Sequence, residues 1–428
     1  MNKTPFDEIS SCLAGYDPEA LRVDLARDFI ARLLPRPSVQ ESVGVRAALG
    51  RVLARDIVST LQVPAHDNAA MDGYALRGAE LRADVETPLR LAGASFAGDA
   101  PLAQPLPPGH CQRIMTGALM PVGLDTVVPQ EFVRVEGALI VIPPGVCKPG
   151  ANRRLAGEDL ALGGVPLRAG RLLQPADLGL LTSLGLAEVP VWRRLRVALM
   201  STGDELRTVD GNNGEPLPPG CVYDSNRTTM WAMLTRLGVE VIDLGVVRDD
   251  PALLRAALTQ AATEADAILT SGGVSVGEAD HTKQVMAELG EMLFWKLAMR
   301  PGRPLAVGTI GRTMLFGLPG NPVAVMVSFY AFVREALLAM SGATPTPLPM
   351  LRAASTRALH KKPGRTEYQR GIVSRAAAGG WQVELAVNQG SGVLSSMSQA
   401  NGLVVLGHDQ GEVAAGDLVD VLPFDGLV

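Results

Sequence analysis

The stretch AILTSGGVSVGEADHTK, residues 267–283, decides the predicted fold and the first functional prediction. Residues 267–270 form a short apolar run of the kind that makes a buried parallel strand. The glycine-rich turn that follows can fold tightly and direct backbone N–H groups at a bound anion. Glu278 and Asp280 come directly after this turn, and they would repel a bare phosphate unless a divalent cation lay between. The pattern therefore favours a nucleotide or another phosphorylated ligand, with a plain tight turn as the alternative.

Strand and helix patterns alternate on both sides of this stretch, over residues 196–345. Further strands are expected at 196–201, 239–245 and 313–318, and helices at 226–238, 251–265 and 322–340. Such alternation predicts parallel strands with right-handed helical crossovers, which is a doubly wound α/β domain. Asp250 and Asn321 each precede a proline, and we expect both side chains to cap the helices that begin there.

The rest of the chain has different residue patterns. Helical spacing appears at 23–34 and 45–57, and residues 61–148 read as short strands broken by Pro-Gly turns. A hairpin-like piece at 162–173 precedes a short helix near Pro175, and alternating strands return at 367–375, 381–387, 402–408 and 417–424. We therefore predict four domains: a discontinuous N-terminal domain (1–60 and 149–195), an inserted β-rich domain (61–148), the α/β domain (196–345) and a C-terminal β domain (346–428).

The composition indicates a soluble cytoplasmic protein. The net charge of −5 argues against binding to nucleic acid or to an anionic membrane. Cys12, Cys111, Cys147 and Cys221 form no CxxC pair, so neither a zinc site nor a disulfide framework is expected. No apolar segment follows the N-terminal lysine, which argues against a signal peptide. The longest apolar run, 323–333, is too short to span a bilayer and is expected to be a core helix.

Polar turns follow each predicted strand of the α/β domain. Glu205 follows the first strand, Asp249 the second, and Pro319 and Asn321 the fourth. In the turn after the third strand, the candidates for ligand binding are Ser271, Gly272, Gly273, Ser275 and Gly277. Capping or turn geometry could explain each turn singly. Because ligands of doubly wound sheets gather at the carboxyl ends of the strands, the four turns together predict a site.

Three cations lie within eight residues around a Pro-Gly turn, and they are Lys296, Arg300 and Arg303. Arginine gives planar bidentate contacts to phosphate and lysine a point charge, so this group suits a pyrophosphate-like ligand. A solvated basic loop is the alternative. A second group of candidates lies in the predicted insertion and just after it: Asp67, Asp72, Thr116, Arg154 and Asp159. Chemistry alone gives none of these a unique mechanism, and the lone His66 and His281 receive no catalytic role.

Several longer segments occur in one order along the chain: DNAAMDGYA, RIMTGALMP with DTVVPQE, NRRLAGED, STGDEL, SGGVSVGEAD, RPGRP and GLPGNPVA. With GSGVLSSMSQANGLVVL in the tail, they closely resemble the MoeA-type molybdopterin molybdenumtransferases, the family that includes the gephyrin E domain. The resemblance covers essentially the whole chain after the first twenty residues. SGGVSVGEAD alone also fits the related MogA-type adenylyltransferases, but DNAAMDGYA and the β tail favour the MoeA type.

The resemblance implies an elongated homodimer whose four-domain subunits contain a MogA-like α/β domain and a β-barrel-like C-terminal domain. The implied reaction takes adenylylated molybdopterin and molybdate, cleaves the phosphoanhydride in a Mg²⁺-dependent step and releases AMP. The implied catalytic residues are Asp72, Thr116, Asp159, Glu205, Asp249 and Asp280, of which the last three would hold Mg²⁺. Substrate binding is implied for Arg154, the turn residues 271–277 named above, Lys296, Arg300, Arg303, Pro319 and Asn321. MogA-type adenylyltransferases and molybdoenzyme apoproteins are the expected protein partners.

This chain departs from the family pattern at three positions. Ala69 stands where serine is common, and Arg300 and Arg303 stand where lysine is common. The first change removes a hydroxyl, and the other two keep the charge but alter its geometry. Two other functions stay open at this point. A MogA-like adenylyltransferase would consume ATP rather than release AMP, and a non-catalytic pterin-binding scaffold would have little need of the acidic positions retained here.

Overall fold

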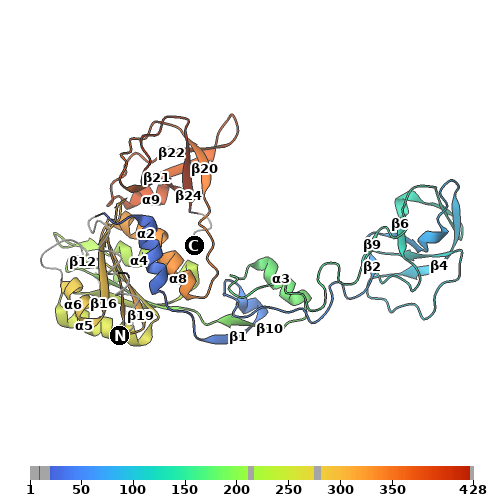
Figure 1. The fold of residues 1–428 in the computed structure, drawn as a ribbon, viewed down its shortest axis with the longest axis horizontal. Helices are drawn as coiled ribbons and strands as arrows, with labels where there is room; N and C mark the ends of the chain where they lie inside the picture. Colours follow the sequence, from blue (N-terminus) through green and yellow to red (C-terminus); the bar gives the residue numbers. More distant parts are fainter. Residues whose placement is uncertain (1–8, 10–19, 211–215, 274–280, 425–428) are drawn as a thin grey trace. The chain divides into compact units, whose positions relative to one another are not determined.

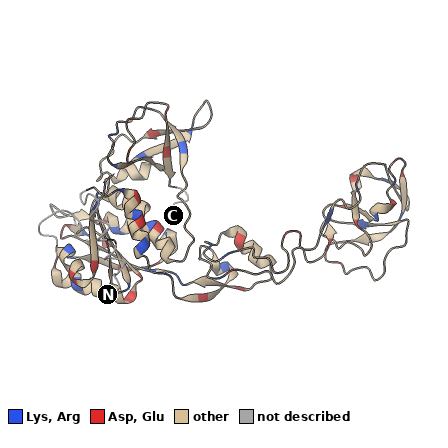
Figure 2. Cartoon of the chain, in the orientation of Figure 1, with Lys and Arg blue, Asp and Glu red and all other residues tan. Residues whose placement is uncertain are grey.

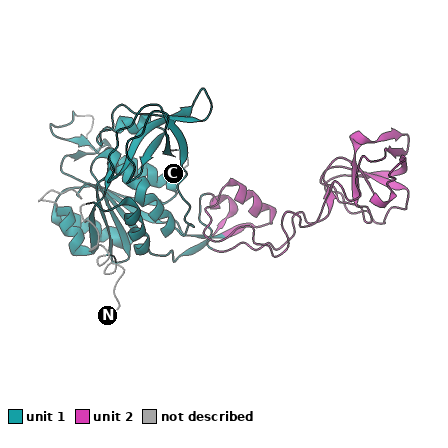
Figure 3. Cartoon of the chain, turned by 45° about the horizontal axis from the view of Figure 1, so that its top comes forward, with its two compact units in different colours: residues 1–41, 50–54, 190–428 teal, residues 42–49, 55–189 magenta. Residues whose placement is uncertain are grey.

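The computed structural model describes residues 9, 20–210, 216–273 and 281–424, which form two compact units (Figure 1, Figure 3). Unit 1 comprises residues 1–41, 50–54 and 190–428, and unit 2 comprises residues 42–49 and 55–189. The boundaries of the four predicted domains are finer than this division and stay predictions. Charged residues of both signs lie on the elements of both units (Figure 2).

The α/β sheet of unit 1 contains the four predicted strands, which pair in parallel. In spatial order, the sheet consists of β14 (Glu240–Val247), β11 (Arg196–Thr202), β15 (Ala267–Ser271), β19 (Thr313–Leu318), β18 (Pro304–Ile310) and β16 (Glu291–Lys296). Ser271 at the end of β15 pairs with Ser201 of β11 and with Leu318 of β19. The turns that follow these strands therefore share one edge of the sheet.

The other two strands of this sheet make it mixed, so the prediction of parallel strands alone was incomplete. β18 runs antiparallel to β19, and β16 runs antiparallel to β18. Residues 294–304 were interpreted only as a basic turn, and the strands on both sides of that turn were missed. The two reversals bring Lys296, which pairs with Pro304, to the edge where β19 ends.

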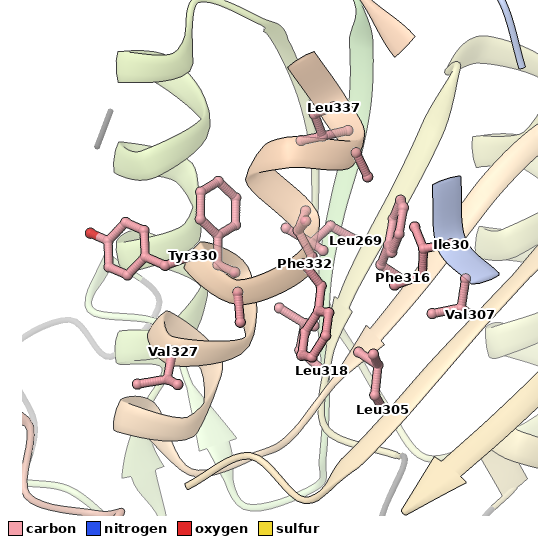
Figure 4. Close-up of a cluster of buried hydrophobic side chains, with 14 of the residues drawn as sticks. Ile30, Leu269, Leu305, Val307, Phe316, Leu318, Val327, Tyr330, Phe332 and Leu337 are labelled. Carbon is pink, nitrogen blue, oxygen red and sulfur yellow. The ribbon is translucent and has the colours of Figure 1, made fainter. Parts of the chain in front are cut away.

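One long apolar helix fills the core of unit 1. α7 (Pro322–Ser328), a π-helical turn (Phe329–Val333) and α8 (Arg334–Met340) run on without a break. Phe332 and Leu337 pack in one buried cluster with Phe316 and Leu318 of the sheet (Figure 4). Among the described residues, Pro322–Met340 is the one helix long and apolar enough to cross a membrane, but 72% of that window is buried inside the protein. The burial and the bounds agree with the predicted core helix at 322–340.

Further helices of unit 1 are α2 (Val23–Leu33), α4 (Ser225–Leu237), α5 (Pro251–Glu264) and α6 (His281–Leu289). The two predicted caps have different outcomes. The Asp250 carboxylate accepts hydrogen bonds from the backbone N–H groups of Ala252 (2.9 Å) and Leu253 (3.0 Å), which confirms the cap of α5. Asn321 does precede α7, but its side chain makes no capping hydrogen bond, so that predicted cap is wrong.

The C-terminal strands close into a barrel, as expected for this domain. The ring runs through β21 (Thr366–Arg375), β22 (Trp381–Leu385), β20 (Leu351–Ser355), β24 (Leu418–Pro423) and β23 (Gly402–Leu406), which pairs again with β21. The four predicted strands are confirmed, whereas β20 and α9 (Leu394–Gln399) were missed. β17 (Met299–Arg300) adds to β21 in parallel and links the barrel to the basic turn of the α/β domain.

Unit 2 contains the predicted β-rich region. Its larger sheet has the order β6 (Thr126–Pro129), β3 (Gly73–Leu76), β5 (His110–Ile114), β4 (Thr87–Ser95), β8 (Leu139–Ile142) and β7 (Arg134–Glu136). Two-stranded pairs are formed by β2 (Asn68–Ala69) with β9 (Arg153–Arg154) and by β1 (Gln40–Gly44) with β10 (Glu188–Trp192). Short 3₁₀ turns occur at Val45–Ala48, Gly78–Glu80 and Gln130–Phe132.

The structure corrects two sequence predictions near these elements. Residues 45–57 do not form a helix beyond the turn Val45–Ala48, because Gly50 takes a left-handed backbone (φ 69°). The residues after it bridge to distant segments, and Ile57 pairs with Leu167. Residues 162–173 therefore pair with that segment instead of forming a hairpin. The predicted helix near Pro175 is confirmed as α3 (Pro175–Ser183).

Candidate functional site

The carboxyl edge of the α/β sheet gathers the predicted acidic residues of unit 1. Glu205 lies in the turn after β11 and Asp249 in the turn after β14. These two strands are parallel neighbours, with Thr202 opposite Val247 at their ends. An ion pair between Arg248 and Asp204 joins the two turns, with a distance of 3.7 Å between Nε and Oδ1. The sheet topology therefore holds both carboxylates at one edge.

The glycine-rich turn after β15 packs closely against its neighbours. Gly272 (φ 91°) and Gly273 (φ 65°) both take left-handed backbone conformations. A Cβ atom on Gly272 would lie 2.6 Å from the carbonyl oxygen of Thr202, and one on Gly273 would lie 2.4 Å from the Thr282 side chain. Only glycine fits at these two positions. The other predicted turn residues, Ser275, Gly277 and Asp280, lie outside the described residues.

Asn226, on the first turn of α4, connects two of the predicted turns and was missed by the sequence analysis. Its side-chain nitrogen donates hydrogen bonds to Ser271 Oγ (2.8 Å) and to the Gly320 carbonyl (2.7 Å). Because a carbonyl can only accept, the amide group must face Gly320 with its NH₂ side. The Oδ1 atom is then left buried with no hydrogen-bond partner within the described ranges. The only signal in the sequence was a polar residue two positions after Asp224, whose carboxylate caps α4.

The described carboxylates can be tested for their fit to a divalent cation. Asp249 is half-buried, and its Oδ1 atom is enclosed without a hydrogen-bond partner in the part of the chain that the structure describes. Glu205 is exposed. No group of three or more His, Cys, Asp or Glu residues is placed for metal binding among the described residues, and the third predicted ligand, Asp280, is not one of them. A buried carboxylate oxygen that lacks a donor fits Mg²⁺, which binds oxygen ligands.

A cavity of about 490 Å³ lies beside these turns in unit 1. Three segments line it: the basic turn 299–304, the turn after β19 and residues 389–391 near the barrel. Four of the predicted substrate residues are in its lining, namely Arg300, Arg303, Pro319 and Asn321. Lys296 is not, although it ends β16 at the same edge of the sheet. The cavity therefore combines cationic, amide and hydroxyl groups, which suits an anionic ligand.

A buried arginine contacts Gly390, which is one of the residues that line this cavity. Arg370 on β21 is 1% exposed, and it donates to the carbonyls of Asn388 (3.2 Å) and Gly390 (3.0 Å) and to Ser396 Oγ (3.1 Å). It makes no ion pair with any acidic residue that the structure describes. Burial, and then the positive charge of Arg300, lower the pKa of the Arg370 guanidinium. The guanidinium nevertheless stays charged, so a buried cation here lacks a counter-ion.

Sequence reasoning also missed Arg370, although a signal was present. Tyr368 and Arg370 are two residues apart on β21, so they share one face of the strand, and both are buried. A cation on the same strand face as a large aromatic residue was that signal, because arginine is rarely buried.

In unit 2, the structure joins Asp72 to Thr116, and the other predicted residues of this cluster lie beside β2, on β9 and after β9. The Asp72 carboxylate accepts two hydrogen bonds from Thr116, one from its backbone N–H and one from its hydroxyl, both at 2.7 Å. The first of these bonds, then the second, and then the charge of Arg113 lower the pKa of Asp72. Asp72 is exposed, so an ionised carboxylate is presented at the surface in a fixed orientation.

Other residues of this cluster come from β2, β9 and the turn after β9. Asn68 pairs with Arg154, and Asp67 lies 3.6 Å from Arg153 and accepts from the Ala156 N–H (2.8 Å). Arg154 and Asp159 are exposed, and neither makes a side-chain hydrogen bond or ion pair with another described residue. These two side chains therefore remain available to a ligand.

The departure at Ala69 has a physical explanation. Ala69 is fully buried and packs in an apolar cluster with Ile114, Ala118, Leu124 and Val127. A serine hydroxyl here would need a hydrogen-bond partner, whereas the methyl group of alanine needs none.

Comparison with known proteins accounts for almost the whole chain. The model of the MoeA N-terminal region (domains I and II) matches residues 21–185, that of a probable molybdopterin-binding domain matches 198–339, and that of the MoeA C-terminal region (domain IV) matches 352–424. The crystal structure of a molybdopterin biosynthesis moeA protein from Pyrococcus horikoshii has a TM-score of 0.82 at 28% identity, covering 95% of this chain and 100% of that one.

Curated relatives match over similar lengths. The molybdopterin molybdenumtransferase of Haemophilus influenzae is 41% identical over 95% of this chain and 100% of its own length. The protein of the same name from Nostoc is 36% identical, over 96% of this chain and 95% of its own length. The three regional matches occur in the order that the sequence motifs indicated, with the barrel of the fourth domain at the C-terminus. The chain belongs to the MoeA family of molybdopterin molybdenumtransferases.

Proposed function

We propose that this protein inserts molybdenum from molybdate into molybdopterin, using adenylylated molybdopterin as the activated substrate and releasing AMP. As a transferase of molybdenum cofactor biosynthesis, it matches curated relatives of that name at 41% and 36% identity over at least 95% of its length. The observation that carries the proposal is the buried guanidinium of Arg370, which has no anionic partner among the described residues and stands beside a cavity lined by Arg300 and Arg303.

A buried cation is costly unless an anion compensates it. Both substrates are anions, and a phosphate or molybdate oxygen in this cavity would face Arg300, with Arg370 behind the wall. Guanidinium groups suit the planar, bidentate recognition of such tetrahedral oxyanions. The glycine turn 271–273 and the unpartnered Asn226 Oδ1 lie at the same edge of the sheet. They would position the phosphate and offer an acceptor to an N–H or O–H group of the ligand.

Glu205, Asp249 and Asp280 are the residues that would hold Mg²⁺, and Asp249 fits this role because its buried Oδ1 lacks a donor. A bound Mg²⁺ would neutralise phosphate charge and polarise the anhydride between the molybdopterin phosphate and AMP. This chain's own residues would hold the pyrophosphate in place at the carboxyl edge. Thr116 keeps the Asp72 carboxylate ionised and oriented.

The exposed cluster of unit 2 would complete the active site on a partner subunit, so we propose a homodimer. Asp72, Thr116, Arg154 and Asp159 would then act on a substrate held by the α/β domain of the other chain. A cytoplasmic location, transfer of substrate from a MogA-type adenylyltransferase and delivery of product to molybdoenzyme apoproteins are parts of the same proposal.

The test is a coupled assay with purified protein, adenylylated molybdopterin, Mg²⁺ and molybdate. AMP should appear in molar proportion to the molybdenum that is bound to molybdopterin, and its release should require molybdate. Consumption of ATP with unmodified molybdopterin would instead indicate an adenylyltransferase. Tight binding of the pterin without any AMP release would indicate a scaffold, and either result would contradict the proposal.

A further inference from the structure

A second cavity, of about 590 Å³, lies at the opposite edge of the α/β sheet. Its lining includes Leu195 before β11, Asp266 before β15 and Thr313 at the start of β19, so it lies where the parallel strands begin. The segment 35–39 after α2 and the β18–β19 turn at 311–312 complete it. The volume is within the range of about 300–1,000 Å³ that small-molecule sites occupy. No residue of the proposed active site lines this cavity.

The charges around this cavity are unbalanced. Arg193 is neutralised, because its Nη2 donates to both carboxylate oxygens of Asp266 (2.8 and 3.1 Å). Asp266 also accepts the backbone N–H of Arg196 (2.8 Å), so its carboxylate is fully engaged. Arg36 and Arg312 make no hydrogen bond or ion pair with any residue that the structure describes, and no other acidic residue lines the cavity. Two exposed arginines without a partner among the described residues therefore line the cavity, in a protein whose net charge is −5.

Part of the remaining wall of this cavity is apolar. Leu33, Leu195 and Met340 are buried residues that line it. The Thr313 hydroxyl already donates to the Ala262 and Ala265 carbonyls (3.0 and 2.9 Å), whereas Ser38 and Thr309 add further hydroxyl residues to the lining. Pro35 and Pro37 limit the backbone freedom of the segment 35–39, which reduces the entropy lost on binding.

We propose that this cavity binds a small organic anion, a phosphate or carboxylate group carried on a compact apolar body. The anionic group would lie between Arg36 and Arg312, since guanidinium binds both kinds of oxyanion in a bidentate manner. The apolar body would cover Leu33, Leu195 and Met340. Because the occupant would contact both segment 35–39 and the sheet, its binding should restrain that segment.

Phenyl phosphate is a suitable probe, with phenylacetate, inorganic phosphate and benzyl alcohol as comparisons. Calorimetric titration measures affinity, and hydrogen exchange at residues 34–39 reports on this cavity rather than on the one beside Arg370. We expect phenyl phosphate or phenylacetate to protect 34–39 and to bind at least about tenfold more weakly to the Arg36→Gln/Arg312→Gln variant. Whichever of the two binds more tightly identifies the anionic group.

The matched control is Arg46→Gln/Arg90→Gln, which removes two exposed arginines outside the cavity and should change nothing. Arg300→Gln should leave the protection of 34–39 intact, because it alters only the other cavity. Equal binding of phenyl phosphate to wild type and the Arg36/Arg312 variant, or no protection of 34–39 by either anion, would overturn the proposal. Inorganic phosphate or benzyl alcohol binding as tightly as phenyl phosphate would also overturn it, because the site would then not require both an anionic group and an apolar body.

Discussion

The two regions that carry the predicted site residues are built in different ways. In unit 1, buried polar groups are only partly compensated by the described residues: Arg370 donates three hydrogen bonds but lacks a counter-ion, and the Oδ1 atoms of Asn226 and Asp249 lack donors. In unit 2, Asp72 is exposed but already accepts two hydrogen bonds from Thr116. Buried groups without partners are costly, and a ligand can satisfy them. We therefore propose that unit 1 is a preformed receptor for an anion, and that unit 2 presents a fixed carboxylate to a ligand bound elsewhere.

The largest expected effect comes from removing a charge in the receptor. Asp249→Asn should lower molybdate-dependent AMP release by roughly 100-fold or more, because the amide keeps the shape but loses the charge that would hold Mg²⁺. We expect the same of Asp280→Asn. Asp250→Asn is the matched control, since asparagine caps a helix as well as aspartate does and α5 should be unaffected. Near-normal turnover of Asp249→Asn at low Mg²⁺ would place the ion elsewhere.

Removal of the buried cation should have the next largest effect. Arg370→Gln should weaken binding of adenylylated molybdopterin or molybdate by about 10- to 100-fold, as expected for a lost charge-assisted interaction. Arg375→Gln on the same strand is the control. The Arg375 Cζ atom lies 4.0 Å from the centroid of the Trp381 ring, and Arg375 is not part of the cavity lining. Titration calorimetry gives both affinities. Equal binding by Arg370→Gln and wild type would show that the buried charge has a structural role only.

Loss of the Asn226 amide should have a smaller effect. Asn226→Ala leaves Ser271 and Gly320 without their shared donor, so we expect KM to rise by about fivefold to tenfold with kcat little changed. Thr228→Ala, at an exposed position of the same helix, provides the control. A fall in kcat with an unchanged KM would instead place Asn226 in the chemical step.

The smallest effect concerns the preset carboxylate of unit 2. Thr116→Val removes one of the two hydrogen bonds that hold the pKa of Asp72 below its ordinary value, so this pKa should rise. A carboxylate whose pKa is lower in the folded protein than in the unfolded chain stabilises the fold at a pH above its unfolded pKa. That stabilisation is lost as the pH falls through its folded pKa. In the variant, the stabilising contribution should therefore be smaller at neutral pH, where Asp72 is still ionised, and it should be lost at a higher pH. Carboxyl NMR titration of Asp72 measures this shift directly, and an unchanged titration would rule out the hydroxyl as its cause.

The sequence predicted more of the fold than of the site's interior. Alternating strand and helix patterns identified the parallel strands, because a buried strand has a continuous apolar run and a crossover helix has a regular spacing. The same patterns did not predict β16 and β18, because the cationic residues between these strands were interpreted as a turn. Helical spacing at 45–57 was misleading because spacing reports burial, and Gly50 breaks the helix. Arg370 and Asn226 were missed because their importance depends on a missing counter-ion and a missing donor, which only the folded chain reveals.

We propose that the receptor of unit 1 and the carboxylate of unit 2 act together in one cleft that two subunits share. Two inactive variants test it, Asp72→Ala in unit 2 and Asp249→Ala in unit 1. If both residues of a cleft came from one chain, every cleft of a mixed dimer would contain one defect. If they come from different chains, a mixed dimer has one doubly damaged cleft and one intact cleft.

The measurement is molybdate-dependent AMP release after the two variants are mixed and allowed to exchange subunits. Random exchange makes about half of the dimers mixed, so we predict that roughly a quarter of wild-type activity returns. Native mass spectrometry verifies the exchange. If mixed dimers form and no activity returns, the two regions do not share a cleft across the subunits, and the account is contradicted.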